Sequence, residues 1–139
     1  MSHSTSVFQY QNGFSSWAAY GVPGRPFITG SELAASEEQK IEFPTITKSI
    51  TVVASGSGDV RVHFDTTSST DVVSQHRYIT LRDAAADPEG GRYEFDVRTK
   101  EIYVSNPGGQ ATGYELCAIC VQVDKNSVQS LSGSGINAN

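Results

Sequence analysis

The residues best suited to metal or redox chemistry are Cys117 and Cys120, the only cysteines in the chain. They lie three apart in an apolar segment that we expect to be a strand, where their Cα atoms are about 10 Å apart and a disulfide requires about 7 Å or less. A zinc site needs further ligands, and the sequence has no second cysteine pair and no His-x-x-x-His motif. We therefore expect two unbridged thiols packed within the fold, which suits a protein made in a reducing cytoplasm.

Three other sets of residues are candidates for catalysis or metal binding. His63 and His76 lie on separate expected strands, and a metal site there lacks a third ligand. Asp83, Asp87 and Glu89 share one loop, without the ligand order of an EF-hand calcium site. Serines abound in glycine-rich turns, where we expect none to lie beside a histidine, and none lies in a Gly-x-Ser-x-Gly motif. The sequence thus predicts a protein that is not an enzyme, with no catalytic residue, metal or cofactor.

Charge and hydropathy exclude two classes of partner. The net charge is -5 and the isoelectric point about 5.0, and the ten Lys and Arg residues are scattered along the sequence. This pattern is unlike the basic patch of a nucleic-acid-binding protein. No apolar run approaches the roughly 18 residues of a membrane span, and the first residues lack the pattern of a signal peptide. We expect neither nucleic acid nor membrane as a partner.

Length and composition indicate one all-β domain. The chain has 139 residues, of which 37% are hydrophobic and only 18% are charged. Much of the polar remainder is Ser, Thr, Asn and Gly, which favour turns or strands over helices. About seven to nine short strands separated by turn residues are typical of an antiparallel β-sandwich or a jelly roll. We predict this fold class.

Alternating apolar and polar residues locate the strands. The alternation is clearest at Tyr93, Phe95 and Val97, and it recurs at Val60 and Val62, where the polar set is expected to point outward. The segment 114–123 is apolar on both faces, so it belongs in the middle of a sandwich or against another subunit. Residues 55–58 predict a hairpin turn, and 32–39 are the one weak candidate for a helical turn. The expected strands of the sandwich are 40–43, 46–54, 60–64, 76–81, 93–97, 101–104 and 114–123.

The first 38 residues differ from the rest. They combine turn signals with five of the twelve Phe and Tyr residues and the only Trp. We interpret 1–38 as an extended arm with short strands near 7–10 and 26–29, and 39–139 as the sandwich with a short C-terminal tail. Trp17 with Tyr20 or Tyr10 is alternatively a platform for stacking sugars. The candidate interface anchors are Phe8, Tyr10, Phe14, Trp17, Tyr20 and Phe27 in the arm, and Leu131 and Ile136 in the tail.

A resemblance to a known family rests on six segments taken in order, namely residues 26–31, 40–54, 60–64, 78–81, 95–106 and 131–136. Together they resemble small virion structural proteins of tailed phages, particularly of cyanophages and related marine phages. The loop at 83–91 is longer than the acidic turn of that family, and the first 20 residues do not match it. No single segment is diagnostic, so the resemblance rests on the ordered set.

The resemblance implies a non-enzymatic capsid decoration or cement protein that binds the outside of the phage head. Its partners are then the major capsid protein or other virion proteins, and it is made in the host bacterial cytoplasm and located on the virion. A homotrimer at three-fold positions follows if it obeys the lattice symmetry. Two alternatives stay open: a tail, neck or fibre component of the same virion, and a carbohydrate-binding adhesion module.

Overall fold

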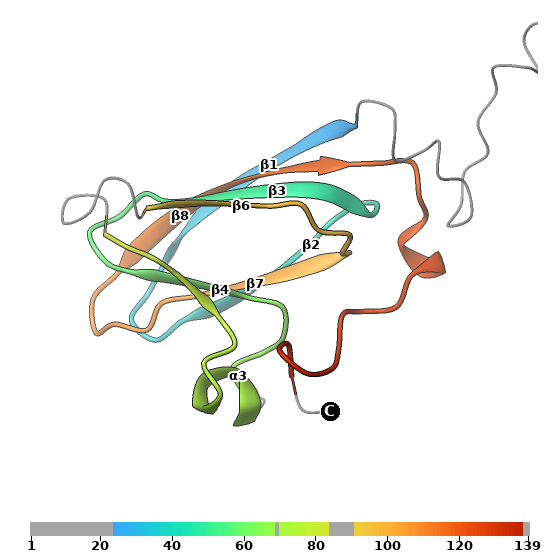
Figure 1. Cartoon of the computed structure of the whole chain (residues 1–139). Helices are drawn as coiled ribbons and strands as arrows, with labels where there is room; N and C mark the ends of the chain where they lie inside the picture. Colours follow the sequence, from blue (N-terminus) through green and yellow to red (C-terminus); the bar gives the residue numbers. More distant parts are fainter. Residues whose placement is uncertain (1–23, 69, 84–90, 138–139) are drawn as a thin grey trace, which may run out of the picture.

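The computed structural model describes residues 24–68, 70–83 and 91–137. Within them the chain is almost entirely β (Figure 1). The elements in chain order are β1 (Arg25–Leu33), β2 (Glu38–Glu42), β3 (Thr47–Ala54), β4 (Val60–His63), α3 (Thr70–Ser74), β5 (Ile79–Leu81), β6 (Arg92–Phe95), β7 (Glu101–Ser105), β8 (Thr112–Cys120) and the 3-10 turn η1 (Lys125–Ser127).

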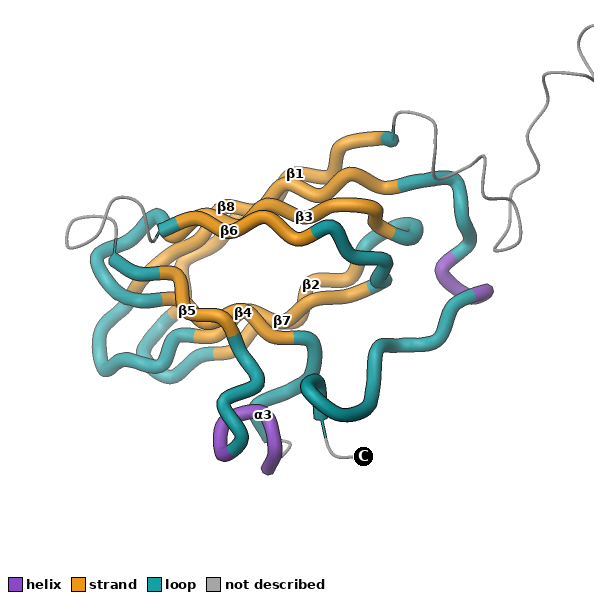
Figure 2. The backbone as a smooth tube through the Cα atoms, viewed as in Figure 1, coloured by secondary structure: helices purple, strands orange, loops and turns teal. Residues whose placement is uncertain are grey.

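The strands form two four-stranded sheets packed face to face (Figure 2). Sheet A has the order β1-β8-β3-β6 and sheet B the order β2-β7-β4-β5, and the pairings are antiparallel. Most successive strands alternate between the sheets, as in the eight-stranded jelly roll. The predicted fold class, an antiparallel β-sandwich of jelly-roll type, is confirmed.

The core lies between the sheets and follows the predicted alternation. Val60 and Val62 of β4 face Ile50 and Val52 of β3 across the sandwich, and all four are buried. The ring of Phe43 closes one end, where it meets Phe27 edge-on with the centroids 5.6 Å apart. The space between the sheets is therefore filled by apolar side chains, whose burial supplies most of the stabilisation of such a fold.

The boundary of the predicted arm differs in the structure. The strand expected at 26–29 is the nine-residue β1, which pairs with β8 over its whole length and so belongs to the sandwich. No helical turn forms at 32–39. Instead the chain reverses between β1 and β2, with Ser36 at a φ of 61° and the Glu37 carboxylate accepting the Ala34 N–H at 2.7 Å. Short polar side chains that bond to nearby backbone favour such turns over helix.

Two further local predictions are wrong. The turn at 55–58 connects β3 of sheet A to β4 of sheet B, so it links the two layers and is not a hairpin. The strand predicted at 76–81 is shorter in the structure, where it is β5, and the short helix α3 precedes it in a segment for which the sequence predicts no strand or helix. The buried Val72 holds α3 against the rest of the domain.

The C-terminal segment crosses from one sheet to the other. After β8, Val121 and Val123 pack with Ile46 in a second small cluster beside the main core. The chain then passes η1 and runs down to the neighbourhood of α3 (Figure 1), where the guanidinium of Arg77 donates to the carbonyl of Asn137. The tail thus lies over the outer side of sheet B. No helix in the described part of the chain is long and apolar enough to cross a membrane.

Candidate functional site

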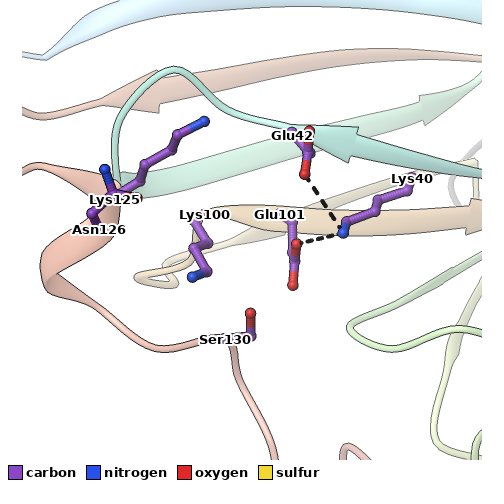
Figure 3. A pocket seen from close by; sticks show the side chains of 7 residues that line it. All are labelled: Lys40, Glu42, Lys100, Glu101, Lys125, Asn126 and Ser130. Atoms are coloured by element: carbon purple, nitrogen blue, oxygen red, sulfur yellow. Dashed lines mark ion pairs between the residues drawn. The ribbon is translucent and has the colours of Figure 1, made fainter.

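A polar cleft lies where the C-terminal segment passes the outer face of sheet B. Its volume is about 360 Å³. Strand β2, the start of β7 and the segment after β8 each contribute side chains to it (Figure 3). The lining residues are Lys40, Glu42, Lys100, Glu101, Lys125, Asn126 and Ser130.

One lysine forms ion pairs with both acids of this cleft. The Lys40 ammonium lies 3.0 Å from the Glu101 carboxylate and 3.5 Å from that of Glu42 (Figure 3). Its hydrogen bond to Glu101, followed by the charge of that residue, holds the pKa of Lys40 above its usual value. The Glu101 side chain is only 13% exposed, so water screens this pair less than the pair with Glu42. Three lysines and two glutamates leave the cleft with one net positive charge.

A buried serine–histidine pair lies further along the same face of sheet B. The Ser105 hydroxyl lies 2.9 Å from His63 Nε2, and His63 Nδ1 lies 2.6 Å from the Asp65 carbonyl. A carbonyl only accepts, so Nδ1 carries the proton and Nε2 accepts from Ser105. Burial lowers the pKa of His63, although the Asp65 carbonyl and the charge of Glu38 act in the opposite direction. The expectation that no serine lies beside a histidine is therefore wrong.

The serine–histidine pair resembles the base and nucleophile of a hydrolase, but it is enclosed. His63 is 1% exposed and Ser105 is 6% exposed. The Tyr103 ring stacks on His63 with the centroids 6.0 Å apart, and the loop after β4 is held over the sheet by hydrogen bonds from Thr67 to Glu38. An external substrate does not reach the hydroxyl in this arrangement. The pair joins β4 to β7 and has a structural role.

The outer face of sheet A carries an apolar strip. Phe27 points into the core, so its neighbours in β1 point outward. Ile28 is 76% exposed and lies opposite Cys117 of β8, while Pro26 lies opposite Ile119. We call these four residues the sheet A strip. A contiguous apolar surface of this kind is typical of an interaction site.

The edge of β1 adjoins the sheet A strip. β1 is the end strand of its sheet, and among the described residues only β8 pairs with it. Its residues 26–31 carry no charge. Proteins usually protect long edge strands with charges, bulges or covering loops, because unpaired backbone groups recruit another strand. The uncharged stretch 26–31 of this edge, which lies between Arg25 and Glu32, is therefore suited to accept an added strand.

The structure locates only some of the predicted anchors. Phe27 is packed on Phe43 inside the sandwich, which corrects its interpretation as an interface anchor. Leu131 and Ile136 are half-buried in the C-terminal segment, and Ile136 belongs to a turn closed by its N–H on the Gly133 carbonyl. The anchors outside the described residues are Phe8, Tyr10, Phe14, Trp17 and Tyr20.

The candidate metal ligands are only partly described. Cys117 and Cys120 are free thiols on opposite faces of β8. Cys120 is buried within the fold as predicted, and burial raises its pKa, whereas Cys117 is only half-buried on the outer face of sheet A. His63 and His76 line one shallow hollow. Asp87 and Glu89 lie outside the described residues, and the described ones contain no group of three or more His, Cys, Asp or Glu side chains arranged to hold a metal ion.

Sequence reasoning missed the three lysines of the cleft. They occur at positions 40, 100 and 125, far apart in the chain, so no local cluster marks them. Pairing of β2 with β7 places Glu42 opposite Glu101, and the returning C-terminal segment adds Lys125 and Asn126. The three lysines can therefore be assigned to one cleft only when this strand pairing and the path of the C-terminal segment are known.

No family model matches the chain, and no curated protein matches it. Solved structures with a similar fold include a de novo designed double-stranded β-helix, with 14% identity over 66% of this chain and 97% of that one at a TM-score of 0.42. A cupin domain of an XRE-family transcriptional regulator from Enterobacter cloacae has 16% identity over 68% and 80%, with a TM-score of 0.44. A cupin superfamily protein from Desulfitobacterium hafniense has 10% identity over 81% and 98%, with a TM-score of 0.41. The jelly-roll assignment rests on the strand order of the chain itself.

Proposed function

We propose that this protein is a non-enzymatic virion structural protein that decorates the outer surface of a phage head and stabilises the shell. The observation that supports this is the sheet A strip beside the uncharged stretch 26–31 of the β1 edge. The aromatic-rich residues 1–23 join the domain directly before this edge. Jelly rolls also occur in viral capsid proteins, which is an analogy at the level of the fold alone.

In the proposed docking, an extended strand of a capsid subunit pairs with β1 while its side chains cover Ile28. Backbone hydrogen bonds along the edge supply affinity, and the apolar contact gives specificity. Covering Ile28 removes from water a side chain worth about 1.5–3 kcal/mol when fully buried. The N-terminal aromatic residues add further anchors on the neighbouring subunit.

The test is co-sedimentation of the purified protein with decoration-free heads of its parent phage. We expect saturation at a multiple of the lattice symmetry, and Ile28→Lys should weaken binding about tenfold or more while leaving thermal stability unchanged. Val73→Lys is the matched control, since Val73 on α3 is also an exposed aliphatic residue, at 43%, away from the sheet A strip. Binding to purified tails in place of heads would transfer the proposal to a tail, neck or fibre component.

The proposed homotrimer needs a separate measurement. Sedimentation equilibrium of the free protein and the copy number per shell at saturation report the oligomeric state in solution and on the lattice. A trimer in solution together with one copy per capsid subunit, which amounts to three at each three-fold position, would support the proposal; a monomer in solution with one copy per capsomer would contradict it.

A further inference from the structure

The lysines of this chain are few and are gathered at one place. The sequence contains four, at positions 40, 48, 100 and 125, in a protein of net charge -5. Three of the four line the polar cleft, and they come from three separate segments (Figure 3). In an acidic protein this is a locally positive site, and it attracts anionic groups.

Of the three lysines that line the cleft, only Lys40 forms ion pairs with residues in the described part of the chain. Lys40 is held between Glu42 and Glu101. Neither Lys100 nor Lys125 forms an ion pair with any residue in the described part of the chain. Two ammonium groups are therefore available for a ligand, and each presents three hydrogen-bond donors.

The rest of the lining adds both donors and acceptors. Asn126 contributes an amide and Ser130 a hydroxyl, and both residues are exposed. The carboxylates of Glu42 and Glu101 have oxygen lone pairs beyond those that face Lys40. A ligand that matches this set needs an anionic group for the lysines and hydroxyl groups that donate to the carboxylates. A volume of about 360 Å³ lies within the range of small-molecule sites.

We propose that the cleft binds an acidic saccharide, with the uronate carboxylate on Lys100 and Lys125 and ring hydroxyls on Glu42 and Glu101. An acidic peptide such as oligoglutamate satisfies the lysines equally well, but it lacks the ring hydroxyl groups that donate to the two carboxylates of the cleft. The cleft is on the outer side of sheet B, opposite the sheet A strip. A molecule docked through sheet A would present the cleft to the surroundings, but the inference does not depend on docking, because it concerns the free protein.

The test is calorimetric titration of the full chain at low salt with four probes: trigalacturonic acid, neutral maltotriose, a triglutamate peptide and inorganic phosphate. We expect trigalacturonic acid to bind one to one and at least tenfold more tightly than each of the other three. The variant carrying Lys100→Gln and Lys125→Gln should lose about tenfold or more of this affinity. Raising the salt concentration should weaken binding of the wild type, because exposed charges are screened.

Lys48→Gln is the control for the loss of a lysine charge: it removes one positive charge outside the cleft, where the double variant removes two within it, and it should leave the affinity unchanged. Thermal unfolding of each variant verifies that substitutions at these half-buried lysines leave the fold intact. Equal binding of maltotriose, stronger binding of the peptide or of phosphate, an unchanged affinity of the double variant, or no binding of trigalacturonic acid would each overturn the proposal. None of these outcomes bears on co-sedimentation with phage heads, so this inference and the decoration role fail separately.

Discussion

His63 shows how a single buried side chain makes the stability of the domain depend on pH. It links β4 to β7 through Ser105 and holds the following loop through the Asp65 carbonyl. Its pKa is lowered mainly by burial, with Arg61 adding to the effect, while the Asp65 carbonyl and the charges of Glu38 and Asp65 oppose it. The folded state therefore favours the neutral ring, whereas the unfolded chain takes up a proton near the ordinary pKa of about 6.5.

The sign of the effect follows from this difference. The contribution of neutral His63 to stability is fully present above about pH 6.5 and is lost as the pH falls toward the lowered pKa of the folded state. Urea unfolding of the wild type between pH 5 and 7.5 should show a decreasing free energy of unfolding on the acid side. In His63→Gln this decrease should be smaller, and the variant should be about 1–3 kcal/mol less stable at pH 7.5 because the ring hydrogen bonds are replaced imperfectly.

The control for this measurement is His76→Asn. His76 is exposed and has a φ of 56°, a conformation that Asn tolerates. This variant should keep the wild-type pH profile. An identical acid-side slope in His63→Gln and the wild type would show that other groups cause the pH dependence.

At the scale of elements, Asn106 joins the connection between β7 and β8 to the connection between β1 and β2. Its amide nitrogen donates to the carbonyls of Leu33, Ala34 and Gln110 at 2.6–3.3 Å, and its side-chain oxygen accepts the Gly108 N–H at 2.9 Å. One buried side chain thus fixes the end of β1, the turn before β2 and the turn after β7.

Asn106→Ala should lower the free energy of unfolding by about 2–3 kcal/mol, because it leaves several buried backbone groups without partners. Asn106→Asp should cost at least as much, since a carboxylate placed against three carbonyls cannot donate to them. Asn126→Ala is the control, because this exposed side chain should contribute less than about 0.5 kcal/mol. Chemical denaturation measures the free energy of unfolding of each variant. Equal values for Asn106→Ala and Asn126→Ala would contradict this role of Asn106.

The elements also show what a sequence of this kind can and cannot predict. The strands and their inward residues follow from alternation, as at Val60 and Val62, because a period of two is a local property. The partners of each strand are not local, so the 55–58 turn is mistaken for a hairpin although it joins two sheets. For the same reason the sequence does not predict that His63 pairs with Ser105, 42 residues away, or that three lysines line one cleft. Composition does predict the class, since few residues favour helix.

For the whole molecule, the two outer faces of the sandwich differ in a way that suggests an orientation. The outer face of sheet B is covered by the loop after β4, α3 and the C-terminal segment, and it carries the polar cleft. The outer face of sheet A has the exposed Ile28 and adjoins the uncharged stretch 26–31 of the β1 edge. Docking through sheet A buries the apolar face and leaves the polar one in water, which is the energetically favoured arrangement.

The N-terminal segment provides the test of this arrangement at the scale of the molecule. Removing residues 1–23 leaves β1 complete, since it begins at Arg25. The truncated protein should therefore keep the thermal midpoint of the wild type within a few degrees and lose binding to phage heads.

A full-length variant in which the five aromatic anchors of this segment are replaced by serine separates the role of the rings from that of chain length, and it should lose binding as well. Trp17, the only tryptophan, reports on the same event in the wild type, because its emission should shift to shorter wavelength when the ring leaves water on docking. Full binding by the truncated protein, with unchanged Trp17 emission in the intact one, would assign attachment to the sheet A strip and the edge of β1 alone.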